Sequence, residues 1–141
     1  MIYLDASALV PIVRIEDHSP IVGKMLFETS DITTSDFAVG EASSAVARLV
    51  RMRQITSDLG WAMLAKLDEW AALKAVVHQI RMQDVRLATQ FVRRFDTGLR
   101  LPDAIHLAIC RRIDVAILTF DDRLSDAAVE LHLAVAAKPM L

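Results

Sequence analysis

The sequence predicts an α/β domain built on a mostly parallel central sheet of four or five strands, with helices on both faces of the sheet. Apolar segments of strand length alternate with helical segments along the whole chain. Residues 115–119 are apolar on both faces, as expected of a central parallel strand. The 141 residues are 54% hydrophobic, with only four glycines and four prolines, no repeat, and no linker long enough to divide the chain. We therefore expect a single domain over residues 1–141.

The first half of the chain predicts two strands and four helices. Apolar residues recur at steps of three and four in the helical segments, and Ser35 or Asp36 can cap the third helix. Thr56 opens the fourth helix in the same way. The expected elements are a strand at 2–4, helices at 7–13 and 19–28, a strand at 32–34, and helices at 36–50 and 57–73.

The second half continues the alternation. The linker 96–100 breaks one helical pattern, and Pro102 can take the first position of the next helix. Asp103 then falls in the first turn, where the helix macrodipole favours an anion. The expected elements are a strand at 75–78, helices at 84–95 and 102–113, a strand at 115–119, a helix at 122–131 and a terminal strand at 133–136.

Four carboxylates lie where a strand ends or a helix begins. Asp5 and Asp121 follow apolar strands, whereas Glu41 and Asp103 occupy early helical turns. Parallel connection brings the carboxyl ends of the strands and the N-termini of the following helices to one edge of the sheet. We therefore expect the four acids to share one site despite their separation in sequence.

An all-oxygen ligand set favours Mg²⁺ or Mn²⁺ over Zn²⁺. Such an ion keeps waters free, and a water can be activated to attack a phosphodiester. Each acid taken alone also has a structural reading, because Asp103 could be only a helix cap and Glu41 only a solvated helix residue. Spacing does not decide between Asp121 and its neighbour Asp122.

The charge is unevenly distributed along the chain. Residues 48–112 contain 12 lysines and arginines against 6 acids, while the flanks are acidic. A cationic surface beside an acidic site suits a phosphate backbone, although any one arginine could simply be solvated. The single cysteine, Cys110, fits a small buried hydrophobe in a reducing compartment, and no signal peptide or membrane span is expected.

Four short motifs occur together in order: Tyr3-Leu4-Asp5-Ala6-Ser7, Gly40-Glu41, Leu101-Pro102-Asp103-Ala104 and Leu118-Thr119-Phe120-Asp121. In this arrangement the chain resembles the PIN-domain ribonucleases over its whole length. Within that superfamily it is most similar to the VapC toxins of toxin–antitoxin pairs. The resemblance implies a three-layer PIN-like fold.

The resemblance further implies a cytoplasmic Mg²⁺- or Mn²⁺-dependent endoribonuclease that acts on transfer RNA or other RNA and leaves 5′-phosphate and 3′-hydroxyl ends. Asp5 and Asp103 would be the principal metal ligands, and Glu41 and Asp121 would hold metal-bound waters or a second ion. Ser7 and Thr119 would support the site. The family also suggests a homodimer and a cognate antitoxin of the VapB type that blocks the site.

Other readings stay open on the residues alone. His106 lies one turn from Asp103 and could act as a base or be a hydrogen-bonded core residue. Trp61 and Trp70 suit core or dimer packing better than base stacking.

The alternative function is a metal-dependent adhesion domain, or a module that binds RNA without cutting it. The adhesion motif Asp-x-Ser-x-Ser would need a second serine where Leu9 stands. A receiver domain would need an acceptor aspartate near Val77, and a haloacid dehalogenase phosphatase would need an acid in place of Ser7.

Overall fold

The computed structural model describes residues 1–140 and contains a four-stranded, fully parallel sheet with the strand order β3-β2-β1-β4. The strands are β1 (Ile2–Leu4), β2 (Ile32–Ser35), β3 (Val76–His78) and β4 (Ala116–Leu118). The helices are α1 (Ala6–Val13), α2 (Ser19–Glu28), α3 (Asp36–Arg51), α4 (Ser57–Lys74), α5 (Met82–Val92), α6 (Leu101–Ile113) and α7 (Asp122–Glu130), with a 3-10 turn, η1 (Phe95–Thr97), before α6.

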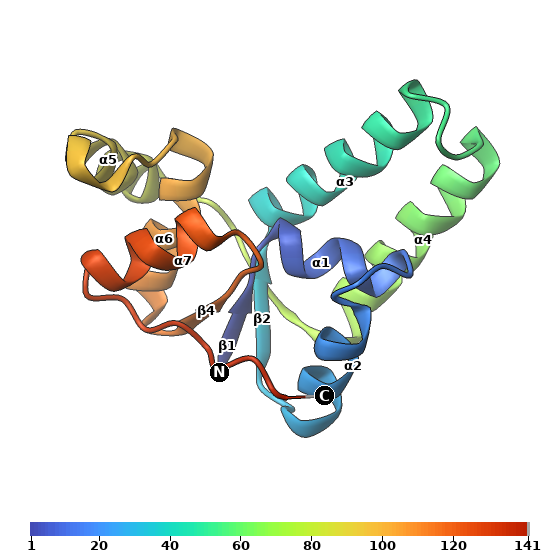
Figure 1. Ribbon diagram of the computed structural model, residues 1–141, viewed down its shortest axis with the longest axis horizontal. Helices are drawn as coiled ribbons and strands as arrows, with labels where there is room; N and C mark the ends of the chain where they lie inside the picture. Colours follow the sequence, from blue (N-terminus) through green and yellow to red (C-terminus); the bar gives the residue numbers. More distant parts are fainter. Residues whose placement is uncertain (141) are drawn as a thin grey trace.

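The helices form two layers, one on each face of the sheet (Figure 1). Helices α1 to α4 pack together on one face, and α5, α6 and α7 lie on the other. Helices α3 and α4 form a long hairpin that extends outward beyond the carboxyl edge of the strands. The predicted α/β class with helices on both faces is therefore confirmed.

The core lies on both sides of β1. Tyr3, Leu4, Ile117 and Leu118 are completely buried because β1 and β4 are covered by helices on both faces. Helix α6 supplies a nearly continuous buried run from Ala104 to Cys110. The burial of these residues fixes where α6 packs along the sheet, and therefore where its first turn lies.

Two expectations about the sheet were wrong. Residues 133–136 do not form a strand; only Val135 makes a single parallel bridge to Ile117. Strand β4 was expected at the centre of the sheet, but it is the last strand in the strand order. Its residues are apolar because helices cover it and the C-terminal segment runs beside it. The strongest hydrophobic run identified a buried strand but not its place in the sheet.

Helix α5 was expected at residues 84–95, but it begins at Met82 and ends at Val92. Asp84 is therefore in the first turn, where its Oδ2 accepts a hydrogen bond of 2.8 Å from the backbone N–H of Arg81. The same carboxylate is almost fully buried and takes a two-point contact from Arg112 of α6, at 2.7 and 3.0 Å. This ion pair joins α5 to α6.

The apolar pattern of α4 predicts burial correctly at some positions and wrongly at others. Met63 and Leu67 are buried, but Leu59, Leu73 and Trp61 are exposed, Trp61 by 72%. The helix belongs to a hairpin that leaves the sheet, so Leu59 and Trp61, in the first turns of α4 at the outer end of the hairpin, meet no core. None of the helices within residues 1–140 has the length and apolar character needed to cross a bilayer.

Candidate active site

Asp5 begins the candidate site as the last residue before α1. Its main chain leaves β1 in an extended conformation, and its Oδ1 accepts a hydrogen bond of 3.1 Å from the backbone N–H of Ala8, which caps the helix. The side chain is only 4% exposed. Burial raises the pKa of Asp5, and hydrogen bonds from neighbouring hydroxyls act in the opposite direction.

Ser7 and Thr119 hold the Asp5 carboxylate from two sides. Ser7 Oγ donates to Oδ1 at 2.6 Å, and Thr119 Oγ1 donates to Oδ2 at 2.6 Å. The backbone N–H of Phe120 donates to Ser7 Oγ at 2.8 Å, so the end of β4 is tied to the start of α1. The two hydroxyl residues proposed as supports are thus in contact with Asp5.

Asp121 caps α7 in the way that Asp5 caps α1. Its Oδ1 accepts from the backbone N–H groups of Arg123 and Leu124, and its own N–H donates to Thr119 Oγ1 at 3.1 Å. Asp122 is an exposed residue of the first helical turn. The negative charge of Asp121 raises the pKa of Asp103.

Asp103 lies in the first turn of α6 and is partly buried. Its pKa is raised, first by burial and then by the negative charges of Asp121, Glu41 and Asp5. The negative charges of the other three predicted acids therefore all act on Asp103, and each of the four residues follows the carboxyl end of a strand or lies in an early turn of a helix.

Glu41 is placed by a chain of buried polar groups that begins in β1. Its Oε2 lies 2.5 Å from His106 Nε2, and His106 Nδ1 lies 2.8 Å from the Tyr3 hydroxyl. The Tyr3 hydroxyl in turn lies 2.7 Å from Ser35 Oγ. His106 is 2% exposed and Tyr3 is fully buried.

One set of hydrogen-bond directions along this chain can be assigned from Ser35 at one end and the Glu41 carboxylate, which only accepts, at the other. Ser35 Oγ already accepts from the N–H of Ala38, which leaves its hydrogen free to donate to Tyr3. Burial holds the pKa of Tyr3 well above its usual value, so this hydroxyl stays protonated and donates to His106 Nδ1. His106 Nε2–H then donates to the Glu41 carboxylate. This set of directions places an imidazole hydrogen on Nε2 and gives every group in the chain a partner.

His106 thus fits the reading of a hydrogen-bonded core residue that contacts the site. The sequence alone did not single out Tyr3 or Ser35, because their partners lie 103 and 32 residues from Tyr3 along the chain. The only available signal was a tyrosine on a strand otherwise built of aliphatic residues. A buried tyrosine hydroxyl needs a partner, and here it has two.

A second aromatic contact adjoins the acids. The His18 ring stacks on the Phe120 ring with centroids 4.1 Å apart and planes inclined by 10°. Phe120 stands between Thr119 and Asp121, so the stack lies beside the acid cluster.

The donor set suits a hard divalent cation. All four acids offer oxygen, and within residues 1–140 no arginine or lysine forms an ion pair with Asp5, Asp103 or Asp121. Mutual repulsion and burial raise the pKa of Asp103, which is the condition that a bound cation relieves. In the same described part of the chain, no three His, Cys, Asp or Glu side chains already converge on one ion position. The residues fit the ion by the chemistry of their oxygen donors.

The adhesion reading loses its remaining support in this geometry. Leu9, at the place of the second motif serine, is completely buried in the core. A residue facing the core at this position has no access to an ion held by Asp5. Ser7, the other motif hydroxyl, is bonded to Asp5 itself.

Comparison with known proteins gives one family. The PIN domain family matches residues 2–130. The curated protein Ribonuclease VapC35 of Mycobacterium tuberculosis is 31% identical over 144 residues, which covers 97% of this chain and 96% of that protein. Ribonuclease VapC46 of the same species is 32% identical over 140 residues, with 96% of each chain covered.

Solved structures with the same fold agree. The crystal structure of Mycobacterium tuberculosis VapC20, described as a Sarcin-Ricin loop cleaving toxin, superposes with a TM-score of 0.77 at 17% identity, covering 99% of this chain and all of that one. VapBC2 from Rickettsia felis, solved bound to a promoter DNA fragment, gives a TM-score of 0.67 at 12% identity over 96% of this chain and 98% of that one. At these identities the two structures establish the fold.

Proposed function

Since this chain belongs to the PIN-domain family, we propose that it is a metal-dependent endoribonuclease of the VapC toxin type, inhibited by a cognate antitoxin. The observation that carries the proposal is the placement of four carboxylates by the parallel sheet: Asp5 and Asp121 cap the helices that follow the paired strands β1 and β4, and Glu41 and Asp103 lie in early turns of α3 and α6. Two curated relatives named as ribonucleases align over nearly the whole chain and support the same reaction.

In this proposal Asp5 and Asp103 hold a Mg²⁺ or Mn²⁺ ion, and Glu41 and Asp121 complete the site through water or a second ion. The cation supplies Lewis-acid stabilisation of a phosphate and activation of water. Ser7 and Thr119 orient the Asp5 carboxylate through their 2.6 Å hydrogen bonds. His106 orients Glu41, and Tyr3 fixes the imidazole in the form that donates to it.

The substrate is RNA, cut to leave a 5′-phosphate and a 3′-hydroxyl. The proposed partner is an antitoxin of the VapB type, consistent with the VapBC pair among the structures of this fold. We also propose a homodimer. Its support is a group of exposed apolar side chains on the edge strand β3 and the start of α5, including Val76 at 53% and Met82 at 70% exposure.

The proposed reaction is tested with purified protein and a mixture of transfer RNAs, followed by mapping of the RNA ends. Wild-type protein should cut with Mn²⁺ and stop in EDTA, and Asp103→Asn should lose at least 100-fold in rate, since the ion is held by few other groups. Cleavage that continues unchanged in EDTA or in Asp103→Asn would refute the assignment.

The adjacent acids Asp121 and Asp122 provide a matched control. Both stand at the start of α7 and differ in whether they touch the site. Asp121→Asn should slow cleavage while keeping the helix cap, because asparagine caps as well as aspartate. Asp122→Asn, with the same change of charge, should cleave like the wild type. Equal loss in both variants would show that charge alone, not position, matters.

A further inference from the structure

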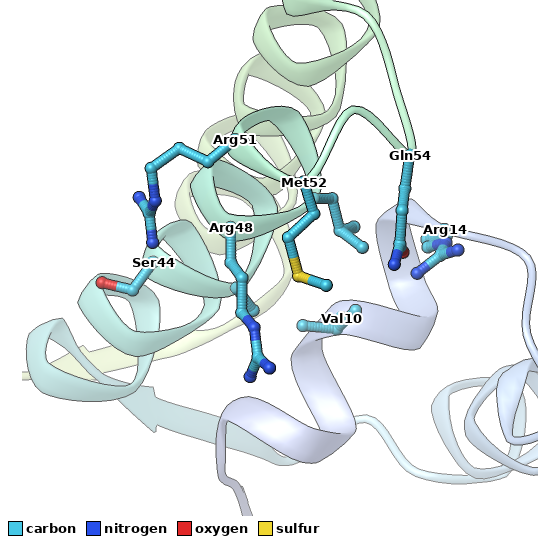
Figure 2. Close-up of a pocket in the computed structure, with 9 residues that line it drawn as sticks. Val10, Arg14, Ser44, Arg48, Arg51, Met52 and Gln54 are labelled. Atoms are coloured by element: carbon cyan, nitrogen blue, oxygen red, sulfur yellow. The ribbon is translucent and has the colours of Figure 1, made fainter.

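A hollow of about 520 Å³ with a cationic rim lies beside α1 and the outer half of α3 (Figure 2). Three arginines reach it: Arg14, at the C-terminal end of α1, and Arg48 and Arg51, in the last turn of α3. Its floor is apolar and includes Val10 and Met52. Figure 2 shows these two side chains between the guanidinium groups of Arg14 and Arg48.

These guanidinium groups are free to bind an external anion. The ion pairs found within residues 1–140 join Arg94 to Asp96, His106 to Glu41 and Arg112 to Asp84, and none involves the three arginines of the hollow. Arg48 and Arg51 also suit the negative end of the α3 dipole, which accounts for their presence in the last turn. Arg14 suits the C-terminal end of α1 in the same way, so the hollow gathers cations from the ends of two different helices.

Along α3 the hollow adjoins a second hollow that contains Glu41. Glu41, Ser44, Arg48 and Arg51 are spaced by three, four and three residues, which places them on one face of the helix. Ser44 lines the cationic hollow and also a second hollow that contains Glu41. At 1.5 Å per residue, Arg48 lies about 10 Å along the helix from Glu41.

We propose that this hollow holds the phosphate backbone of the RNA, about three nucleotides away from the bond that is cut. The inference rests on the proposed ribonuclease function and adds where the substrate is held. The acid site itself repels a polyanion, so the affinity for RNA must come from cations elsewhere. Three unpaired guanidinium groups on a path that leads to Glu41 supply them, with fork geometry suited to phosphate.

An acidic protein segment could also bind arginines, but the placement favours RNA. A ligand held here lies against the same helix face as Glu41, and the substrate of that site is a polyanion with one charge at about every 3.4 Å of stacked strand. The apolar floor between the arginines can receive a base or a ribose. The acidic segment is therefore treated as a competing outcome of the experiment.

The test is RNA binding in EDTA, where the RNA stays intact, measured by fluorescence anisotropy of a labelled 20-nucleotide single-stranded RNA between 50 and 200 mM KCl. The variant carries Arg14→Gln, Arg48→Gln and Arg51→Gln. The matched control carries Lys66→Gln, Arg86→Gln and Arg93→Gln, three exposed residues with the same total charge. A third protein with lysine at all three positions of the hollow keeps the charge and reports on folding.

Each phosphate contact contributes about 0.7 to the slope of log affinity against log salt for a single strand. The triple glutamine variant should therefore lose about 2 from the slope, so that the salt increase weakens the wild type roughly 20-fold more than the variant. The matched control and the lysine variant should retain the wild-type slope.

The proposal is overturned if the glutamine variant binds RNA with the wild-type slope, or if the matched control loses as much. It is also overturned if the glutamine substitutions abolish binding of a labelled polyglutamate peptide and leave RNA binding unchanged, because the hollow then serves a protein segment. Cleavage with Mn²⁺ in the same preparations separates the two levels. A wild-type protein that cuts RNA while the arginines prove irrelevant refutes only this inference, whereas one that cuts no RNA refutes the function as well.

Discussion

Replacing Asp5 by asparagine should abolish cleavage and raise stability at the same time. Asp5 is almost completely buried, and the burial raises its pKa, so its charge opposes folding at neutral pH. Asparagine removes that charge and keeps the cap on α1, because aspartate and asparagine are equally good in this position. Asp5 would thus serve the proposed reaction while lowering the free energy of unfolding.

The hydrogen bonds around residue 5 allow the exchange. The new amide oxygen can accept from Ser7 and Ala8 as Oδ1 does now. The new amide N–H can donate to Thr119 Oγ1, whose own hydrogen then turns toward Ser7 Oγ, 3.3 Å away. The amide oxygen, one amide N–H and both hydroxyls then have partners. The second amide N–H offsets only part of the gain, because an unpaired N–H costs less than a buried carboxylate charge.

Substitutions that remove strained or repelling groups from active sites commonly stabilise by about 0.5–2 kcal/mol. For a chain of this size that corresponds to a rise in Tm of roughly 2–8 °C. Asp5→Ala removes the cap as well as the charge. Loss of a cap costs about 0.5–2 kcal/mol, so this variant should be clearly less stable than Asp5→Asn.

The pH dependence of the free energy of unfolding independently tests whether the Asp5 charge opposes folding. With the pKa of Asp5 raised in the folded state, the penalty is present above the raised pKa and disappears as the pH falls through it toward the ordinary value of 3.8. The stability difference between Asp5→Asn and wild type should therefore shrink in acid. Measuring a difference cancels the titration of the acids that do not interact with Asp5.

Chemical and thermal unfolding at pH 7 and at acidic pH, with EDTA present, measures both effects. Adding Mn²⁺ should then raise the Tm of the wild type and leave that of Asp5→Asn nearly unchanged. The reasoning is refuted if Asp5→Asn unfolds at or below the wild-type temperature in EDTA, or if its advantage grows as the pH falls.

Three further outcomes are expected. Arg112→Met should destabilise by about 3–5 kcal/mol in urea titrations, because it leaves the buried Asp84 carboxylate without its partner. A loss of stability below about 1 kcal/mol would contradict this. The control Arg86→Met, at an exposed position, should lose little stability. Tyr3→Phe should cost about 1–3 kcal/mol, since His106 Nδ1 and Ser35 lose a partner, and should reduce the cleavage rate more than RNA binding; an unchanged rate would show that the chain does not position Glu41. Val76→Lys should convert a dimer to a monomer in light scattering if β3 contributes to the interface; a dimer that persists would place the contact elsewhere.

The sequence predicted the local structure well where a short pattern determines it. Strand β1 and helix α2 have the expected bounds, and Ser35 and Thr56 cap α3 and α4 through bonds to residues three positions ahead. These signals depend on neighbours in sequence. The grouping of the four acids followed from parallel connection alone, because every strand delivers its carboxyl end to the same edge.

The features that sequence reasoning missed depend on distant partners. The chain from Ser35 through Tyr3 to His106 and Glu41 joins three segments, and no pattern within any one of them announces it. Asp84 was expected to begin a helix, whereas its burial depends on Arg112 in the next one. The place of β4 at the sheet edge depends on pairing order, which hydrophobicity does not encode.

The two helical layers divide the acids between them. Asp5 and Glu41 belong to the layer of α1 to α4, and Asp103 and Asp121 to the layer of α5 to α7 (Figure 1). The separation of Asp5 from Asp121 is consequently set by the pairing of β1 with β4, the strands that precede them. The outer part of the α3–α4 hairpin lies beyond Glu41 and can therefore change in length and sequence while the acid spacing is retained. Such a change would alter the surface that the hairpin presents without moving the acids.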